Sequence, residues 1–319
     1  MSGRRLTVLR AGLSTTVQDL GRWGHQALGV PVAGPMDTYA HRLANACVGN
    51  PPEAATLEVT MLGPEIEATA AVRAAVAGAS FDVAVNGTAM PLHAAFDVPA
   101  GARLRFGMRH QGARAYLAVA GGIATPPVLG SRATHLVSGM GGIDGRALAV
   151  GDVLPVGTSA AAPVARPTAA ATCSYLPEGG RARLRVLLGP QDGWFTRAAL
   201  DALASGTFTV SARSNRMAFA LDGPPLPVAR DGEPISEPVP FGAIQVPAGG
   251  APLLLMADRQ TAGGYLKIAT VILADLPVAG QLAPGDVITF VPCTRADALA
   301  ALIARERDLL RVAPGAAVA

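Results

Sequence analysis

Short runs that alternate apolar and polar residues recur through the first half of the chain and are bounded by glycine-bearing turns. This pattern is typical of half-buried β-strands. It predicts strands over residues 6–12, 56–62, 64–70, 73–79, 81–87, 103–108, 114–122 and 147–156. Residues 14–35 carry glycine and proline at the density of a loop, and a loop is expected there.

The second half repeats the pattern and adds helices. Further strands are expected over residues 182–191, 207–212, 243–248, 252–258, 271–275 and 286–292. Apolar residues at helical spacing predict helices over 35–50, 193–203 and 294–312. The last of these is amphipathic, and the apolar residues available to pack on a β-barrel are Leu299, Leu302, Ile303, Leu309 and Leu310. The sequence therefore predicts a mainly β protein with a few covering helices.

The chain is expected to form two domains joined by a linker. With 319 residues it is long for one domain, and 50% hydrophobic residues supply enough apolar side chains for two cores. Residues 159–180 are rich in alanine and proline and have no apolar period, which is typical of a linker. The predicted division is a first β domain over 1–158, this linker, and a second β domain over 181–319 that includes the C-terminal helix.

A weak internal repeat suggests that the two domains are related. A glutamate lies five residues before a glycine in both halves, at Glu58 and at Glu237. Each half also closes on a Gly-Asp turn before a strand, at Gly151 and at Gly285. Two related barrels are therefore expected.

Charge and composition exclude several classes of function. The net charge is +3, but the arginines are scattered among acidic residues, and Arg181, Arg183 and Arg185 alternate as one solvated face of a strand, so nucleic-acid binding is not expected. The 3 cysteines lie far apart and suggest neither a disulfide framework nor a zinc site. No segment resembles a signal peptide or a membrane span, so a soluble cytoplasmic protein is expected.

Several catalytic motifs are absent from the sequence. The chain has a single lysine, Lys267, and a leucine precedes it, so a phosphate loop of the type GxxxxGK[ST] cannot occur. There is no GxSxG elbow and no HExxH motif, and the 5 histidines lack metal-ligand spacing. A nucleotide would have to be held in another way.

Lys267 belongs to a polar segment, "QTAGGYLK", that is suited to binding a small ligand. Every other member of the 26 lysines and arginines is arginine, so the retained ammonium suggests a role that a guanidinium cannot fill. If the segment is extended, Tyr265 and Lys267 share one face. The alternative is a surface lysine that covers apolar neighbours. The set of donors and small residues suited to an amide, carboxylate or phosphate comprises Gln260, Thr261, Gly263, Gly264, Tyr265 and Lys267.

Three other polar segments are candidates for ligand binding. Gln18, Asp19 and Arg22 lie among glycines that leave backbone amides open to a ligand, unless the aspartate and arginine form a surface ion pair. Asp37 lies at a predicted helix start, where its carboxylate stabilises the helix dipole or marks an anion site. Ser131 lies in a glycine-rich loop that either wraps a polar ligand or forms a cluster of tight turns.

Several segments taken together resemble a known family. In order they are "TTVQDLGRWGHQALGVPVAGPMD", "RLANACVGNP", "LEVTMLGP", "YLAVAGGI", "VLGSRAT", "SEPVPFGAIQVP" and "DRQTAGGYLKIA". From about residue 6 to residue 295 they are similar to the signature segments of the carboxyltransferase-domain family, also known as allophanate hydrolase subunit 2. Its members include the C subunit of the bacterial 5-oxoprolinase, the antagonist of a sporulation-kinase inhibitor, and part of the carboxyltransferase region of urea carboxylase.

The resemblance implies two cyclophilin-like β-barrel domains and partner proteins. The partners are the subunit 1 protein, also called the B subunit, and, for 5-oxoproline cleavage, a third lactam-hydrolase subunit. The predicted catalytic residues are Lys267, Tyr265 and Gln260. The predicted substrate-binding residues are Gln18, Asp19, Arg22, Asp37, Ser131, Gln245, Thr261, Gly263 and Gly264. The chain departs from the family pattern, which has glycine, arginine, threonine and proline at these places, at Ala218, Ala220, Ala262 and Leu266.

The first functional hypothesis is a subunit of an ATP-dependent 5-oxoprolinase, with ATP bound by the assembled complex. The second is carboxyl transfer between biotin and an amide such as urea, with biotin as the cofactor. The third is a regulatory module that binds and sequesters a partner protein.

Overall fold

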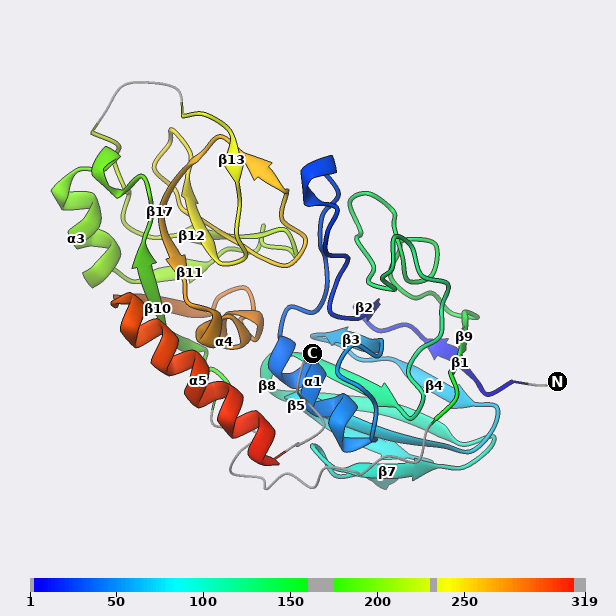
Figure 1. The fold of residues 1–319 in the computed structure, drawn as a ribbon. Coiled ribbons are helices and arrows are strands. Elements are labelled where there is room, and N and C mark those ends of the chain that lie inside the picture. Colours follow the sequence, from blue (N-terminus) through cyan, green and yellow to red (C-terminus); the bar gives the residue numbers. More distant parts are fainter. Residues whose placement is uncertain (1–2, 160–174, 230–233, 313–319) are drawn as a thin grey trace. The chain divides into compact units, whose positions relative to one another are not determined.

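The computed structural model describes residues 3–159, 175–229 and 234–312, which form two compact units rich in β-structure (Figure 1). Unit 1 comprises Met1–Arg22, Ala33–Leu176 and Glu306–Ala319, and unit 2 comprises Trp23–Val32 and Pro177–Arg305. Residues 160–174, which make up most of the predicted linker, lie outside the described residues. The prediction of a mainly β protein with few helices is confirmed.

Unit 1 is built on a nine-stranded sheet with the central order β2-β3-β8-β4-β1-β9. The strand bounds are β1 Arg5–Arg10, β2 Ser14–Gln18, β3 Thr56–Thr60, β4 Glu65–Ala68, β5 Val72–Val85, β6 Thr88–Ala89, β7 Ala95–Val98, β8 Arg103–Val119 and β9 Val153–Pro155. β5 pairs with β6, β7 and β8. The strands predicted at 73–79 and 81–87 are one strand, β5, and those at 103–108 and 114–122 are also one, β8. The interruptions mark irregular pairing between β5 and β8, with register shifts from Gly78 to Val83, and not turns.

The expected loop over 14–35 begins with a strand. β2 pairs antiparallel with β3 from Ser14↔Thr60 to Gln18↔Thr56. Its β-branched threonine and valine residues favour a strand, and this preference outweighs the glycines that follow. Gln18 is therefore the last residue of a strand and not part of a loop.

One helix of unit 1 covers the sheet. α1, Thr38–Cys47, packs against β5 and β8. It begins three residues after Pro35, because the Asp37 carboxylate caps it and accepts the Ala40 N–H at 2.9 Å.

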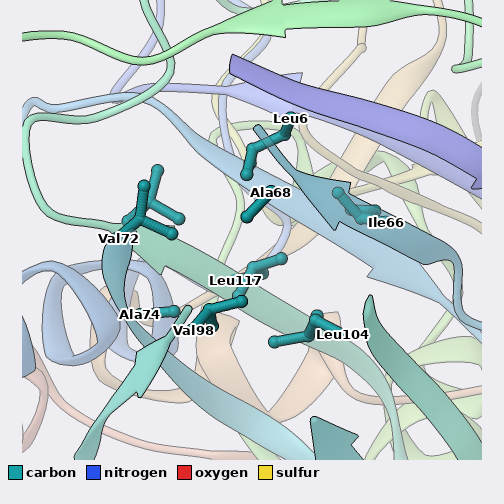
Figure 2. Close-up of a pocket in the computed structure, with 9 residues that line it drawn as sticks. Leu6, Ile66, Ala68, Val72, Ala74, Val98, Leu104 and Leu117 are labelled. Atoms are coloured by element: carbon teal, nitrogen blue, oxygen red, sulfur yellow. The ribbon is translucent and has the colours of Figure 1, made fainter. Parts of the chain in front are cut away.

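The core of unit 1 is apolar and contains a very small cavity. Figure 2 shows the side chains around it, and its volume is about 10 Å³. The lining residues are Leu6, Ile66, Ala68, Val72, Ala74, Val98, Leu104, Leu117 and Val119. Because the lining offers no polar side chain, this space is a packing gap and not a ligand site.

Unit 2 contains a closed barrel with the strand order β10-β17-β14-β15-β12-β11-β18. The strand bounds are β10 Arg181–Leu188, β11 Phe208–Val210, β12 Ala218–Asp222, β14 Ala243–Val246, β15 Leu253–Leu255, β17 Leu266–Val271 and β18 Val287–Pro292. β10 and β18 close the barrel as a parallel pair. A separate two-stranded ribbon joins β13, Glu237–Pro238, to β16, Ala262–Gly263.

The remaining helices correct two expectations. Their bounds are η1 Gln26–Leu28, η2 Asp192–Trp194, α3 Arg197–Ser205, η3 Leu273–Asp275, α4 Leu276–Gly280 and α5 Arg295–Val312. The strand predicted at 271–275 is wrong, because β17 ends at Val271 and the Asp275 carboxylate, bound by Arg185, fixes a turn into α4. In α5, Leu309 is buried as expected, but Leu299 and Ile303 are exposed. No helix in the described part of the chain is both long and apolar enough to cross a membrane.

The Gly-Asp turn of the predicted repeat takes the same form in both units. Gly151 and Gly285 each have a φ of 91°. The aspartate that follows accepts the N–H of the residue three positions earlier, at 2.7 Å for Asp152 and 2.8 Å for Asp286. A valine N–H of a neighbouring strand donates to each aspartate carbonyl, at 2.9 and 2.8 Å. The repeat read from the sequence is therefore present as a repeated turn, although the two sheets differ.

Candidate functional site

Lys267 lies in the barrel wall of unit 2 and is buried. It belongs to β17, and its side chain, like the rest of the residue, is almost inaccessible, with 4% of the residue exposed. Pairing of β14 with β17 places Gln245 opposite Lys267, next to a register shift between Ile244 and Gln245. The alternative of a surface lysine is therefore wrong.

The Lys267 ammonium pairs with a carboxylate that the sequence did not single out as a site residue. Nζ lies 3.0 Å from Glu237 Oε2, and Gln191 Nε2 donates to the same oxygen at 2.8 Å. These hydrogen bonds, first from Lys267 and then from Gln191, hold the pKa of Glu237 below its usual value. A buried lysine requires an anionic partner, but the burial of Lys267 is known only from the structure. Spacing alone could not select Glu237 from the other acidic residues.

Two glutamines predicted from the sequence meet beside this pair. Gln260 Nε2 donates to Gln245 Oε1 at 3.3 Å, and Gln245 Nε2 donates to the Tyr265 carbonyl at 3.4 Å. A Cβ atom on Gly263 would lie 3.0 Å from Gln260 Nε2 and 3.1 Å from Gln245 Nε2. Glycine at this position therefore lets the two amides pack closely.

The loop that carries Gln260 and Thr261 is fixed at both ends. Val239 N donates to the Thr261 carbonyl at 3.0 Å, which extends the β13–β16 ribbon. Before the loop, Arg216 and Asp258 form a buried bidentate ion pair with both contacts at 3.0 Å. This arrangement keeps the polar segment on a rigid support.

Tyr265 does not share the environment of Lys267. It precedes β17 and is 51% exposed, so the strand alternation that would place both side chains on one face does not reach it. Gly264 lies beside it, near Ser236 Oγ. Tyr265 is thus available at the surface of unit 2, whereas Lys267 is enclosed.

The four departures from the family pattern lie on three strands of unit 2. Ala218 and Ala220 belong to β12, opposite Leu255 and Leu253. Ala262 is exposed on β16, and Leu266 is buried at the start of β17. The structure gives no reason why these four residues replace the usual ones.

In unit 1, Gln18, Asp19 and Arg22 all bond to the loop that carries Ser131. Asp19 accepts hydrogen bonds from Gly21 N at 3.0 Å, Ser131 Oγ at 2.5 Å and Arg132 N at 2.5 Å. Arg22 donates through Nη2 to the carbonyl of Ala133 at 2.5 Å. Asp19 and Arg22 are both buried, so the alternative of a surface ion pair is wrong. These contacts tie the end of β2 to the loop that carries Ser131.

Gln18 also bonds inside unit 1. Its Nε2 donates to Thr16 Oγ1 at 3.0 Å and to the Thr134 carbonyl at 3.1 Å. Its Oε1 is buried and has no hydrogen-bond partner among the described residues.

Asp37 is part of a buried network around the start of α1. Besides capping the helix, its Oδ2 accepts the Tyr175 hydroxyl at 2.9 Å. The Tyr116 hydroxyl donates to Glu58 at 2.7 Å and accepts the Asp37 N–H at 2.8 Å. Burial, assisted by Glu58, raises the pKa of Tyr116 well above its usual value, so the phenol stays protonated. Glu58 and Tyr116 were not predicted as polar network residues.

The sequence-predicted residues thus divide between the two units into a unit 1 cluster and a unit 2 cluster, in which Asp37 and the exposed Tyr265 have surroundings of their own. Unit 2 holds the cluster with an enclosed cation, and unit 1 holds a cluster whose polar groups support a loop and a helix start. The unit 2 cluster contains Gln245, Gln260, Thr261, Gly263, Gly264, Tyr265 and Lys267. The unit 1 cluster contains Gln18, Asp19, Arg22, Asp37 and Ser131.

Comparison with known proteins identifies the family. Residues 28–292 match the sequence profile described as "Carboxyltransferase domain, subdomain A and B". The chain belongs to the carboxyltransferase-domain family. Among its relatives in this family, the 5-oxoprolinase C subunit of Escherichia coli is 39% identical over 296 residues, which cover 93% of this chain and 94% of that protein. The corresponding protein of Haemophilus influenzae is 32% identical over 89% of this chain and 90% of its own length.

Larger members of the carboxyltransferase-domain family contain a similar region. The urea amidolyase of Saccharomyces cerevisiae is 34% identical over 88% of this chain, but the match covers 16% of that protein. The solved structure of K. lactis urea amidolyase aligns with 99% of this chain and 20% of its own, at 31% identity and a TM-score of 0.91. TTHA0988 aligns with 91% of this chain and 56% of its own, at 38% identity and a TM-score of 0.79.

Proposed function

We propose that this chain is a subunit of an ATP-dependent 5-oxoprolinase, which opens 5-oxo-L-proline to L-glutamate. The observation that supports this reaction is the end-to-end match with the 5-oxoprolinase C subunit, which covers 93% of this chain and 94% of the relative. The match with urea amidolyase covers a small part of a much longer protein. The similarity thus extends over nearly the whole length of the 5-oxoprolinase C subunit.

The unit 2 cluster has the chemistry that lactam opening requires. When water adds to the carbonyl carbon, negative charge develops on the carbonyl oxygen; the ring C–N bond then breaks, and the nitrogen takes a proton. A fixed ammonium in an enclosed site stabilises such charge. Lys267 would supply the ammonium, and Gln260 and Tyr265 would supply an amide and a phenol that orient the ring, with Gln245 and Thr261 beside them.

ATP would activate the resonance-stabilised amide: the amide oxygen would take the γ-phosphoryl group and ADP would leave. Water would then add to the carbon and the ring C–N bond would break, and a second water would hydrolyse the resulting acyl phosphate to the carboxylate and phosphate. The only lysine of the chain follows Leu266, so a phosphate loop is absent from this sequence and gives ATP no such site here. We therefore assign ATP to the assembled complex, with the B subunit and a third lactam-hydrolase subunit as partners in the cytoplasm. The residues of this chain would bind and polarise the amide.

A steady-state assay with 5-oxo-L-proline and ATP tests this proposal. The purified single chain should show no turnover, because the catalytic set is shared, and co-purified complex with both partner subunits should release L-glutamate. Turnover by the single chain would contradict the shared site. An assembled complex without turnover would overturn the reaction itself.

Carboxyl transfer between biotin and an amide nitrogen is the second candidate. The TM-score of 0.91 with K. lactis urea amidolyase and the description of the family favour it. Here the same donors would polarise a urea carbonyl, and biotin would arrive on a separate carrier protein. Carboxylation of urea that depends on bicarbonate and a biotin carrier, with no release of glutamate from 5-oxoproline, would select this function.

A further inference from the structure

Glu237 forms an ion pair that joins an enclosed cation to an accessible anion. The Lys267 side chain is 5% exposed, whereas the Glu237 side chain is 43% exposed. An unpaired buried charge is strongly destabilising, so the ammonium requires this carboxylate. The hydrated carboxylate does not require the ammonium to the same degree.

Gln191 fixes the geometry of this pair. Its Nε2 donates to Glu237 Oε2 at 2.8 Å, and its Oε1 accepts the backbone N–H of Lys267 at 3.2 Å. A Cβ atom on Gly189 would lie 2.1 Å from the Lys267 carbonyl oxygen, so glycine allows the Gln191 turn to approach β17. One amide therefore bridges the lysine backbone and the carboxylate that holds its side chain.

The backbone of Glu237 is fixed by the segment that carries the predicted catalytic residues. Glu237 pairs with Gly263 in the β13–β16 ribbon. Gly263 lies between Gln260 and Tyr265 in sequence, so the carboxylate and the polar loop are held in one register.

We propose that Glu237 is a positioning residue that orients the Lys267 ammonium toward the reacting carbonyl oxygen. An ammonium has three N–H donors. Glu237 takes one, and among the described residues no second acceptor contacts Nζ. The other two donors would then bind the oxygen on which charge develops. This role rests on the proposed function, but the contact itself can be tested without it.

The single lysine gives a direct readout in the isolated full-length chain. Protein labelled with [ε-13C]lysine has one lysine signal in its NMR spectrum, because the sequence contains one lysine. Glu237→Ala should move this signal, and sodium formate, which replaces the missing carboxylate, should return it in a saturable manner. Glu178→Ala, which removes an exposed glutamate of unit 2, should leave the signal unchanged and without response to formate. A signal that Glu237→Ala does not move overturns the proposal.

Turnover of the assembled complex tests the positioning role. Glu237→Ala should lower kcat about 10- to 100-fold with little change in KM, because a small misplacement of a catalytic group costs on this order. Formate should restore part of kcat. Glu237→Gln leaves no space for formate. It should lower kcat by a similar factor, and formate should not restore kcat. Unchanged kcat in both variants overturns the positioning role, whereas a wild-type complex without turnover overturns the proposed function and leaves the NMR result standing.

Discussion

The contacts of Lys267 depend on the size and donor geometry of its ammonium as well as on its charge. Its ammonium reaches Glu237 Oε2 from inside the barrel wall, and its backbone binds Gln191. A planar guanidinium is larger and has its donors in a fixed fork, so it cannot reproduce this contact in the same enclosed space.

Lys267→Arg should therefore lower turnover of the assembled complex about as far as Lys267→Met. Loss of a donor aimed at developing charge typically reduces the rate on the order of a hundredfold, roughly 3 kcal/mol. The melting temperature should change little with methionine, because Glu237 remains hydrated. Arg183→Met, on the exposed face of β10, serves as the control. Turnover close to wild type in both lysine variants would contradict a catalytic role.

Two buried histidines predict how stability depends on pH. Burial lowers the pKa of His41 and of His93 from 6.5 to about 4. His41 is satisfied as a neutral ring, with Nδ1 3.0 Å from Thr56 Oγ1 and Nε2 2.9 Å from the Pro52 carbonyl. Both histidines are thus neutral in the folded protein at pH 7.

The unfolded chain binds protons on these histidines between pH 6.5 and 4, and the folded chain does not. Their contribution to stability is therefore complete above pH 6.5 and is lost as the pH falls toward 4, by about 3 kcal/mol for each histidine. Urea unfolding at several pH values measures this slope. His93→Asn should reduce it, and asparagine tolerates the φ of 59° at this position. An unchanged slope in that variant would show that His93 titrates normally.

At the residue scale, sequence reasoning found the cation and its amide neighbours but not the groups that hold it. Lys267 was marked by its rarity, and Gln260 by its proximity in sequence. Gln191 lies 76 residues from Lys267 in sequence, and its contact arises because β10, which it follows, pairs with β17. A pairing of this kind leaves no local pattern in a sequence.

At the element scale, helix α1 depends on a cap that also serves a wider network. Asp37 accepts the Ala40 N–H at the helix start and the Tyr175 hydroxyl from a distant segment of unit 1. Thr196 caps α3 in unit 2 through one bond, to the Ala199 N–H. The two caps therefore differ in how much structure they support.

Asp37→Ala should destabilise unit 1 by about 2 to 3 kcal/mol, since it removes the cap and a buried hydrogen bond. Thr196→Ala, the matched control, should lower stability by about 1 kcal/mol. Chemical denaturation followed by circular dichroism gives both values. Equal losses in the two variants would mean that the Tyr175 contact adds nothing.

Most strands, but not all, could be predicted from the sequence pattern. The apolar alternation placed most strands correctly, because half-buried strands impose it locally. The glycine and polar interruptions in β5 and β8 were interpreted as turns, although long pairing across irregular register continues through them. β2 was missed because the glycine and proline residues that follow it give residues 14–35 the composition of a loop.

At the scale of the whole molecule, each unit contains the same type of Gly-Asp turn, but the sheets of the two units differ. The nine-stranded sheet and the closed barrel each contain a Gly-Asp turn with a glycine φ of 91°. Apart from the glycine and its two chain neighbours, no heavy atom lies within 4 Å of a Cβ built on Gly151 or Gly285, so the positive φ alone favours glycine there.

Gly151→Ala and Gly285→Ala should therefore have nearly equal effects, each a loss of about 1 to 2 kcal/mol. Hydrogen exchange resolved by peptide would assign each loss to its own unit. Gly193→Ala, equally open but without a positive φ, should change little. Unequal losses would mean that the two turns, although alike in geometry, carry different strain.

Closure of the unit 2 barrel joins strands from opposite ends of its sequence. β10 and β18 pair in parallel from Arg181↔Val287 to Val186↔Pro292. This pairing closes the loop formed by the chain between β10 and β18. Closing so long a loop is slow, because its conformational entropy is lost before the contacts between the two strands compensate for it. During synthesis, the barrel cannot be completed until β18 has left the ribosome. The edge of β10 that pairs with β18 therefore stays unpaired while about a hundred residues are added.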